Sequence, residues 1–291
     1  MGSRNPIARQ VHANGLAHRV LEWSGAEAAA PTVLLIHGFM DAGGTWDLVA
    51  PQLVAAGLRV IAPDLRGFGD SPRAPVGSYY HFPEYIADIA GISAELVKKE
   101  PLFVVGHSMG GTVATLFAGA FPERVSRLAL LEGLGPPNNL PEHAPDRMHR
   151  WIADLAKYRS EPHRTMSREE ALRRLCERHS GIDQEIVATR LPHLVTAVEG
   201  DRVVWKFDPL HRALSPFPFF ASTYEAYAAR IACQVLIVGG GPEGFHPEDE
   251  PKRIAAFKNV QSTTIDGAGH MMHWTRPSAL AELLLGFLRV T

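Results

Sequence analysis

Short apolar runs rich in branched side chains recur along the chain, separated by longer amphipathic stretches. The runs lie at Val33–Ile36, Leu58–Ala62, Leu102–Val105, Leu128–Leu131, Val235–Val238 and, more weakly, Ser262–Ile265. Unbroken apolar runs of this length are typical of strands buried on both faces, as in a parallel sheet. The stretches between them, such as Tyr85–Lys98 and Thr112–Phe121, predict helices. This alternation predicts a doubly wound, mostly parallel α/β fold.

The alternation stops in residues 135–230, where the sequence contains no convincing buried strand. Helices are expected there at Asp146–Tyr158, Ser167–His179 and Asp183–Leu191, the last ended by Pro192. Ser167 followed by Glu170 forms a capping box, which supports a helix start. The sequence therefore predicts a core made of residues 1–134 and 231–291 and an inserted helical cap of residues 135–230. The alternative is a core that continues through this segment with irregular strands.

Composition narrows the range of partners. The 291 residues are 46% hydrophobic and 21% charged, and 29 basic against 31 acidic side chains leave a formal net charge of −2. This balance gives no electrostatic reason to expect a nucleic acid or an anionic membrane as a partner. No apolar run approaches the ~18 residues needed to cross a bilayer, so no membrane span is predicted.

Cysteine usage and the N-terminus bear on the cellular location. Two cysteines, Cys176 and Cys233, cannot form a disulfide framework or a cysteine-based zinc cluster. The first residues lack the apolar stretch of a secretory signal. A cytoplasmic protein is therefore expected, and its oligomeric state is left open.

The strongest chemical motif is G-x-S-x-G, which occurs as G-H-S-M-G at residues 106–110. It directly follows a predicted strand and directly precedes a predicted helix, which is the context that a nucleophile elbow requires. The flanking glycines allow a tight turn, so that Ser108 projects from the N-terminal end of the helix, where the helix dipole favours negative charge. Ser108 is the candidate nucleophile, and the backbone N–H of Met109 is one candidate oxyanion donor.

A second motif, H-G-F at residues 37–39, follows an early predicted strand and leads into a glycine-containing loop. In an acyl-transfer enzyme such a loop supplies the other oxyanion donor. We expect the backbone N–H of Phe39 to do so, with Met40 as the near alternative. His37 is expected to hold the loop in place rather than to act as a base.

The candidate general base lies near the end of the chain, in G-A-G-H at residues 267–270. His270 follows a strand-like run and a glycine-rich turn, and it would take the proton from Ser108 and return it to the leaving group. His273 is a second candidate three residues further on. No histidine falls in an H-E-x-x-H pattern, so no metal site is predicted, and this chemistry is expected to need no cofactor.

These motifs occur in an order and at spacings that resemble the α/β-hydrolase superfamily. They are H-G at residues 37–38, D-L-R-G-F-G-D-S at 64–71, the elbow at 106–110 and G-A-G-H at 267–270. The segment L-E-G-L-G-P-P at residues 131–137, followed by a helical cap, is similar to the branch called serine hydrolase-like proteins. The resemblance implies an α/β-hydrolase fold with a Ser-His-acid triad. A serine at position 108 departs from haloalkane dehalogenases and epoxide hydrolases, which need an aspartate there.

Two glutamates compete for the third position of the triad, which must lie between nucleophile and histidine in chain order. Glu243 follows the predicted strand Val235–Val238 and matches the family's usual acid position, with Glu in place of the commoner Asp. Glu132 ends the predicted strand Leu128–Leu131, a position that a minority of the family uses. We favour Glu243, with Glu132 as the alternative acid.

The expected activity is hydrolysis of a carboxylic ester or thioester through an acyl-enzyme. Aromatic side chains in the predicted cap indicate either an apolar small-molecule acyl substrate or packing of cap against core: Trp151, Trp205, Phe207, Phe217, Phe219 and Phe220. The same machinery also serves carbon–carbon bond hydrolysis of diketones, which arginines in the pocket would favour. Some α/β-hydrolase folds are non-catalytic binding proteins, and an intact Ser108–His270 pair weighs against that reading.

Overall fold

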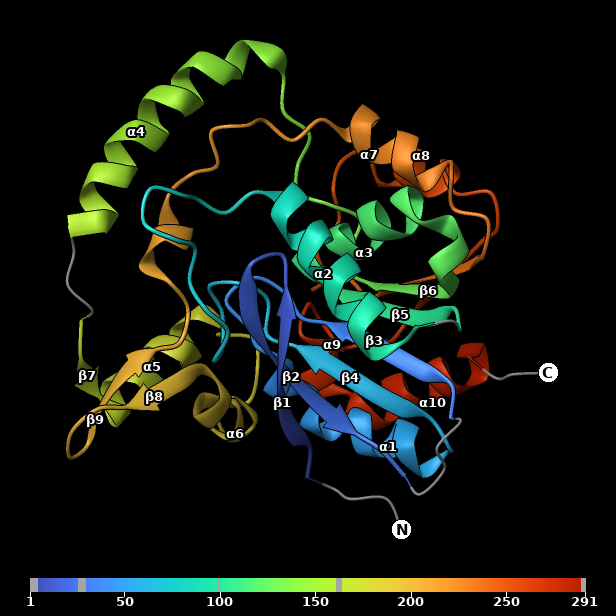
Figure 1. The fold of residues 1–291 in the computed structure, drawn as a ribbon, viewed down its shortest axis with the longest axis horizontal. Helices are drawn as coiled ribbons and strands as arrows, with labels where there is room; N and C mark the ends of the chain where they lie inside the picture. Colours follow the sequence, from blue (N-terminus) through green and yellow to red (C-terminus); the bar gives the residue numbers. More distant parts are fainter. Residues whose placement is uncertain (1–4, 26–29, 99, 161–163, 289–291) are drawn as a thin grey trace.

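An eight-stranded sheet forms the centre of the protein (Figure 1). The computed structural model describes residues 5–25, 30–98, 100–160 and 164–288. The strand order is β1-β2-β4-β3-β5-β6-β10-β11, antiparallel from β1 to β4 and parallel from β4 onward. The bounds are β1 (Ile7–Ala13), β2 (Leu16–Trp23), β3 (Thr32–Ile36), β4 (Arg59–Pro63), β5 (Leu102–His107), β6 (Val125–Leu131), β10 (Gln234–Gly239) and β11 (Val260–Thr264). Every strand predicted from an apolar run is present, and the predicted doubly wound fold is confirmed.

The hairpin β1–β2, which lies at the edge of the sheet, was not predicted from the sequence. Its turn is formed by Asn14 and Gly15, both with positive φ (47° and 75°), as a two-residue hairpin turn requires. The first four residues of β1 are exposed, and polar side chains interrupt both strands. No apolar run therefore marks them in the sequence.

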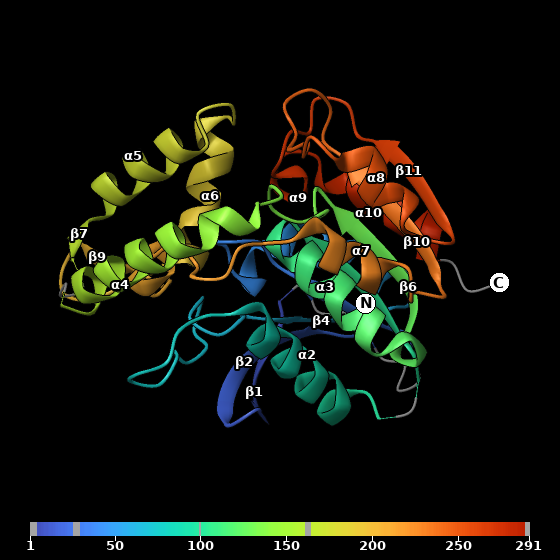
Figure 2. The ribbon, with the colours of Figure 1, turned by 90° about the horizontal axis from the view of Figure 1, so that it is seen from above.

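Helices cover both faces of the sheet and bury two hydrophobic layers (Figures 1 and 2). The first face carries α2 (Phe82–Leu96), α3 (Met109–Ala120), α7 (Ala221–Ala228) and α8 (Glu250–Ala255), and the second carries η1 (Gly43–Leu48), α1 (Ala50–Ala55), α9 (Met272–Thr275) and α10 (Pro277–Leu288). In β3, Leu34 and Ile36 pack in the first layer and Val33 and Leu35 in the second. This alternation follows from the two-residue period of a strand. A short turn, η2 (Pro122–Arg124), leads from α3 into β6.

The segment between β6 and α7 lies beside the core as a separate layer (Figure 2). It contains η3 (Pro141–His143), α4 (Ala144–Ser160), β7 (Met166–Ser167), α5 (Arg168–Arg178), α6 (Gln184–Leu194), β8 (Val195–Ala197), β9 (Arg202–Trp205) and η4 (Pro209–Arg212). The helices lie where the sequence predicted them, and the hydroxyl of Ser167 accepts a hydrogen bond from the Glu170 N–H at 3.1 Å. Within the described ranges, no helix is long and apolar enough to cross a bilayer.

Three features of this segment differ from the expectation. α6 continues through Pro192 to Leu194, because a proline so near the helix end removes a single backbone hydrogen bond. β7, β8 and β9 form a small antiparallel sheet whose strands are too short to leave an apolar run. α7, inside residues 135–230, packs on α3, where the Tyr224 hydroxyl lies 3.1 Å from that of Thr115. The predicted boundaries between core and cap, at residues 134/135 and 230/231, stay a prediction. The predicted core and the predicted cap each include residues outside the described ranges.

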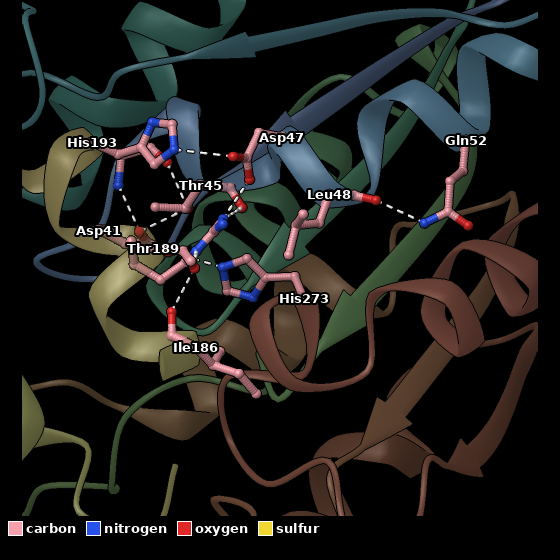
Figure 3. Close-up of polar contacts among 11 residues, drawn as sticks. Asp41, Thr45, Asp47, Leu48, Gln52, Ile186, Thr189, His193 and His273 are labelled. Atoms are coloured by element: carbon pink, nitrogen blue, oxygen red, sulfur yellow. Dashed lines mark hydrogen bonds and ion pairs between the residues drawn. The ribbon is translucent and has the colours of Figure 1, made fainter. Parts of the chain in front are cut away.

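Partly buried polar contacts join α6 to η1 (Figure 3). Arg190, which is 2% exposed, forms an ion pair with the carboxylate of Asp47. His193 Nε2 lies 3.1 Å from the other Asp47 oxygen. Burial works against the charged form, yet the hydrogen bonds from His193 and Arg190 lower the pKa of Asp47. The segment that carries the predicted cap is thereby held on the core by charge-assisted hydrogen bonds.

Candidate active site

Ser108 lies at the turn between β5 and α3 with a left-handed backbone, φ 51° and ψ −119°. A non-glycine residue in this region is strained by about 1–3 kcal/mol, which the surrounding structure must offset. Gly110 makes the turn possible, because a Cβ there would collide with the carbonyl oxygens of Ile36 and His37. The elbow therefore has the geometry that its motif requires, and it holds Ser108 at the N-terminus of α3.

His270 reaches Ser108 from the loop that follows β11. Its Nε2 lies 3.0 Å from the Ser108 Oγ, within hydrogen-bond distance. His107 lies beneath this pair, and its Nε2 donates a hydrogen bond of 2.8 Å to the backbone carbonyl of His270. Burial, together with the nearby His273 and His270, holds the pKa of His107 well below its usual range, so this ring is neutral. His107 thus positions the backbone of the candidate base, a role that no sequence motif signals.

Glu132 occupies the position behind His270. It directly follows β6, has a left-handed φ of 52°, and its side chain is 1% exposed. Its Oε2 lies 3.5 Å from His270 Nδ1. Backbone N–H groups of Gly240 and Phe245 donate to its two oxygens. The separation of 3.5 Å exceeds an ordinary hydrogen bond, and such catalytic contacts often tighten when substrate binds.

Glu243, the acid favoured by the sequence, is exposed. In the part of the chain that the structure describes, no hydrogen bond or ion pair joins it to His270. Its loop nevertheless takes part in the site, because Gly240 and Phe245 on either side of it donate their N–H groups to Glu132. The geometry therefore favours the alternative acid, Glu132, over Glu243.

The two candidate oxyanion donors flank Ser108. Met109 is the first residue of α3, so its N–H has no acceptor inside the helix. The loop that carries Phe39 approaches closely, because a Cβ on Gly38 would lie 3.2 Å from the Ser108 Cβ. Met40 bends the loop with a left-handed φ of 58°. This arrangement leaves the N–H groups of Phe39 and Met109 as candidates, as the sequence indicated.

The ring of His37 holds the loop of Phe39 in place. It is fully buried, its Nδ1 donates to the Gly38 carbonyl at 2.7 Å, and its Nε2 accepts from the Leu65 N–H at 3.0 Å. Through these two hydrogen bonds, His37 ties the loop that carries Gly38 and Phe39 to the loop that follows β4. This agrees with the expectation that His37 holds the loop rather than acting as a base.

A cavity of about 930 Å³ lies in front of Ser108 and His270. Eight aromatic side chains contribute to its wall: Phe39, Tyr79, Tyr80, Phe82, Tyr85, Phe217, Phe219 and Phe245. Of the aromatic residues singled out in the predicted cap, Phe217 and Phe219 line this cavity. Trp205 packs with Phe207 instead, Trp151 packs on Tyr79, and Phe220 precedes α7. The predicted aromatic group therefore divides between cavity wall and packing.

Comparison with known proteins identifies the family. The profile of the alpha/beta hydrolase fold matches residues 31–277. The chain belongs to the α/β-hydrolase family. A serine hydrolase-like protein of Dictyostelium discoideum is 23% identical over 91% of this chain and 76% of its own length. An sn-1-specific diacylglycerol lipase of Mus musculus is 27% identical over 90% of this chain and 82% of its own length.

Solved structures agree with this assignment. The thioesterase domain from the curacin biosynthetic pathway superimposes with a TM-score of 0.81 at 26% identity, covering 96% of this chain and 99% of that domain. The relatives named here include a lipase and a thioesterase, and together with the family assignment they identify the chain as an α/β-hydrolase enzyme.

Behind the site, the α/β-hydrolase core buries three polar side chains together. The donor atoms of Asp41, His107 and His273 lie within 4.8 Å of one another, a set that could hold a metal ion. Asp41 also accepts a hydrogen bond of 3.0 Å from His273 Nε2. Although burial opposes the charge of Asp41, this bond lowers its pKa to about 2. His273, the second candidate base, is thus paired with Asp41 (Figure 3), while His270 contacts Ser108.

Proposed function

We propose that this α/β-hydrolase is a serine hydrolase that cleaves a carboxylic ester or thioester through the triad Ser108–His270–Glu132. The observation that carries the proposal is the 3.0 Å separation between Ser108 Oγ and His270 Nε2 at a strained elbow. The relatives named as a lipase and a thioesterase support ester-type substrates. Because Glu132 and His270 lie 3.5 Å apart, Glu132 replaces Glu243 in the proposed triad.

In the proposed mechanism, His270 Nε2 accepts the Ser108 proton as Oγ attacks the substrate carbonyl. The carbonyl oxygen becomes an oxyanion, which the N–H groups of Phe39 and Met109 stabilise. His270, now protonated and facing Glu132, gives its proton to the leaving alcohol or thiol. A water molecule then attacks the acyl-enzyme while His270 accepts one of its protons. As the bond between the acyl group and Ser108 Oγ breaks, His270 returns this proton to Oγ, and the carboxylic acid is released.

Intact-mass analysis after treatment with a fluorophosphonate tests the nucleophile. We expect one adduct on the wild-type protein and none on Ser108→Ala. Circular dichroism checks that both proteins are folded. A folded wild-type protein without an adduct would contradict the proposal, because it would show that Ser108 is not activated. A panel of 4-nitrophenyl esters and acyl thioesters of increasing chain length then separates esterase from thioesterase activity.

Carbon–carbon bond hydrolysis of an acidic diketone is a second candidate on the same triad. It is favoured by Arg147 and Arg150, which line the cavity and would bind an acidic substrate. Adding a diketone acid and its ester counterpart to the panel tests this candidate. Faster cleavage of the diketone than of any ester would select it over ester hydrolysis.

A further inference from the structure

Three arginines give the lining of the cavity positive charge. Arg147 and Arg150 reach the cavity from α4, and Arg212 reaches it from η4. Glu132 is the carboxylate among the lining residues. It is already bonded to two backbone N–H groups and faces His270, so it does not neutralise the arginines. The charge in the cavity contrasts with the slightly negative net charge of the whole chain.

Arg147 is the most enclosed of these arginines. Its Nε is buried without a hydrogen-bond partner, and among the described residues no carboxylate pairs with it. Arg150 lies one helical turn further on, and like charges at this spacing repel. Arg150 has a distant carboxylate neighbour, Asp154, at 3.9 Å. A partly buried guanidinium without a counter-ion is costly, so this arrangement favours an anionic ligand.

His81 adds an unused polar atom to the same wall. Its Nδ1 is buried without a partner, and its ring lies 5.1 Å from that of Tyr79. Tyr79 is fixed by a hydrogen bond of 2.6 Å to the Ala213 carbonyl, and its phenol interacts electrostatically with Asp154 and Arg147. Tyr79 therefore lies near both His81 and Arg147. His81 and Arg147 both line the cavity, although the two unpaired nitrogens themselves are enclosed.

We infer that Arg147, Arg150 and His81 form a subsite for a carboxylate at the end of the substrate's acyl chain, away from the scissile carbonyl. A guanidinium binds a carboxylate through two parallel hydrogen bonds, which the terminal Nη atoms of Arg147 can donate. The aromatic walls between this subsite and Ser108 hold the apolar part of the chain. The preferred substrate is then a half-ester or half-thioester of a dicarboxylic acid. This inference rests on the proposed function for the bond that is cleaved, but not for the binding of the anion.

Matched substrates test the subsite. Mono-4-nitrophenyl esters of dicarboxylic acids from succinate to sebacate are compared with their methyl-capped, neutral counterparts. We expect at least one acid to be cleaved with a higher kcat/KM than its capped form. In Arg147→Met the ratio of kcat/KM for the acid to kcat/KM for its capped form should fall by about tenfold to a hundredfold, mainly through the KM for the acid. Arg230→Met, which removes an exposed arginine outside the cavity, serves as the control and should keep the preference.

Binding without turnover separates this inference from the proposed function. Ser108→Ala is titrated calorimetrically with suberate, and the double variant with Arg147→Met should bind it at least tenfold more weakly. If wild-type protein cleaves no ester but this loss is seen, the subsite stands and the proposed activity fails. Equal binding by both variants, or a preference for capped esters, would overturn the subsite. Stronger competition by inorganic phosphate than by suberate would overturn the choice of a carboxylate.

Discussion

Replacing Glu132 by glutamine tests the proposed triad most directly. The change keeps the size of the side chain but removes the charge that faces His270 during catalysis. At the observed 3.5 Å, and with an effective dielectric constant of about 20, a carboxylate stabilises an imidazolium by about 5 kcal/mol. Since each 1.36 kcal/mol changes a rate about tenfold, kcat should fall by roughly three orders of magnitude.

The substitution also affects stability, so the assay must separate the two effects. The carboxylate of Glu132 accepts backbone hydrogen bonds from Gly240 and Phe245. A glutamine keeps one acceptor and turns an NH₂ group toward the other N–H, which costs about 1–3 kcal/mol. Steady-state hydrolysis of a 4-nitrophenyl ester is therefore measured beside thermal unfolding, at a temperature where the variant is fully folded.

Glu243→Gln is the matched control, because Glu243 is exposed and carries the same charge. We expect its kcat to stay within about twofold of the wild type, since it lies outside the triad. A large loss of kcat in Glu243→Gln, with Glu132→Gln near the wild type, would return the acid to the position favoured by the sequence. Near-normal activity in both folded variants would refute the need for a carboxylate behind His270.

Two further predictions concern stability. Gly110→Ala should yield little folded protein, because its Cβ would collide with backbone at the elbow. Gly286→Ala in α10, where a Cβ meets no atom within 4 Å, should instead raise the free energy of unfolding by about 0.5–1 kcal/mol. Thermal unfolding measures both effects. Acidification should destabilise the fold through His211, since burial lowers its pKa from 6.5 to about 3. The unfolded chain takes up this proton as the pH falls below 6.5 and the folded chain does not, so about 2 kcal/mol is lost by pH 5. Urea titrations at pH 7 and pH 5 should show this loss and a smaller one in His211→Asn; equal midpoints at both pH values would contradict it.

The sequence was most informative where one local pattern decides the structure. Each strand predicted from an apolar run is present, because a strand buried on both faces must be continuously apolar. The position of Ser108 followed from the short range of its motif, in which the strand, the turn and the helix adjoin. The sequence Asn14-Gly15 is also a local signal for a hairpin turn. The strands on either side were not predicted, because polar residues interrupt their apolar positions.

The acid could not be chosen from local patterns, because two strand ends adjoin in space. β6 and β10 are neighbours in the sheet, so Glu132 and the loop after β10 reach the same place. In the structure, Glu132 faces His270 from a backbone with a left-handed φ, which a glutamate rarely adopts and which no sequence pattern predicts. The packing of His107 beneath His270 also depends on contacts across the fold.

The attachment of α6 to η1 sets a condition for building chimaeric enzymes. η1 directly follows the loop of Phe39 and Asp41, so Arg190 fastens the exchanged segment close to the catalytic machinery. A foreign cap grafted at residues 135–230 would leave Asp47 without its guanidinium. Because the Asp47 side chain is 31% exposed, the cost lies below the about 3–5 kcal/mol of a fully buried pair. A successful graft must keep α6 or neutralise Asp47. Cap exchange that ignores this contact would disturb turnover as well as substrate choice.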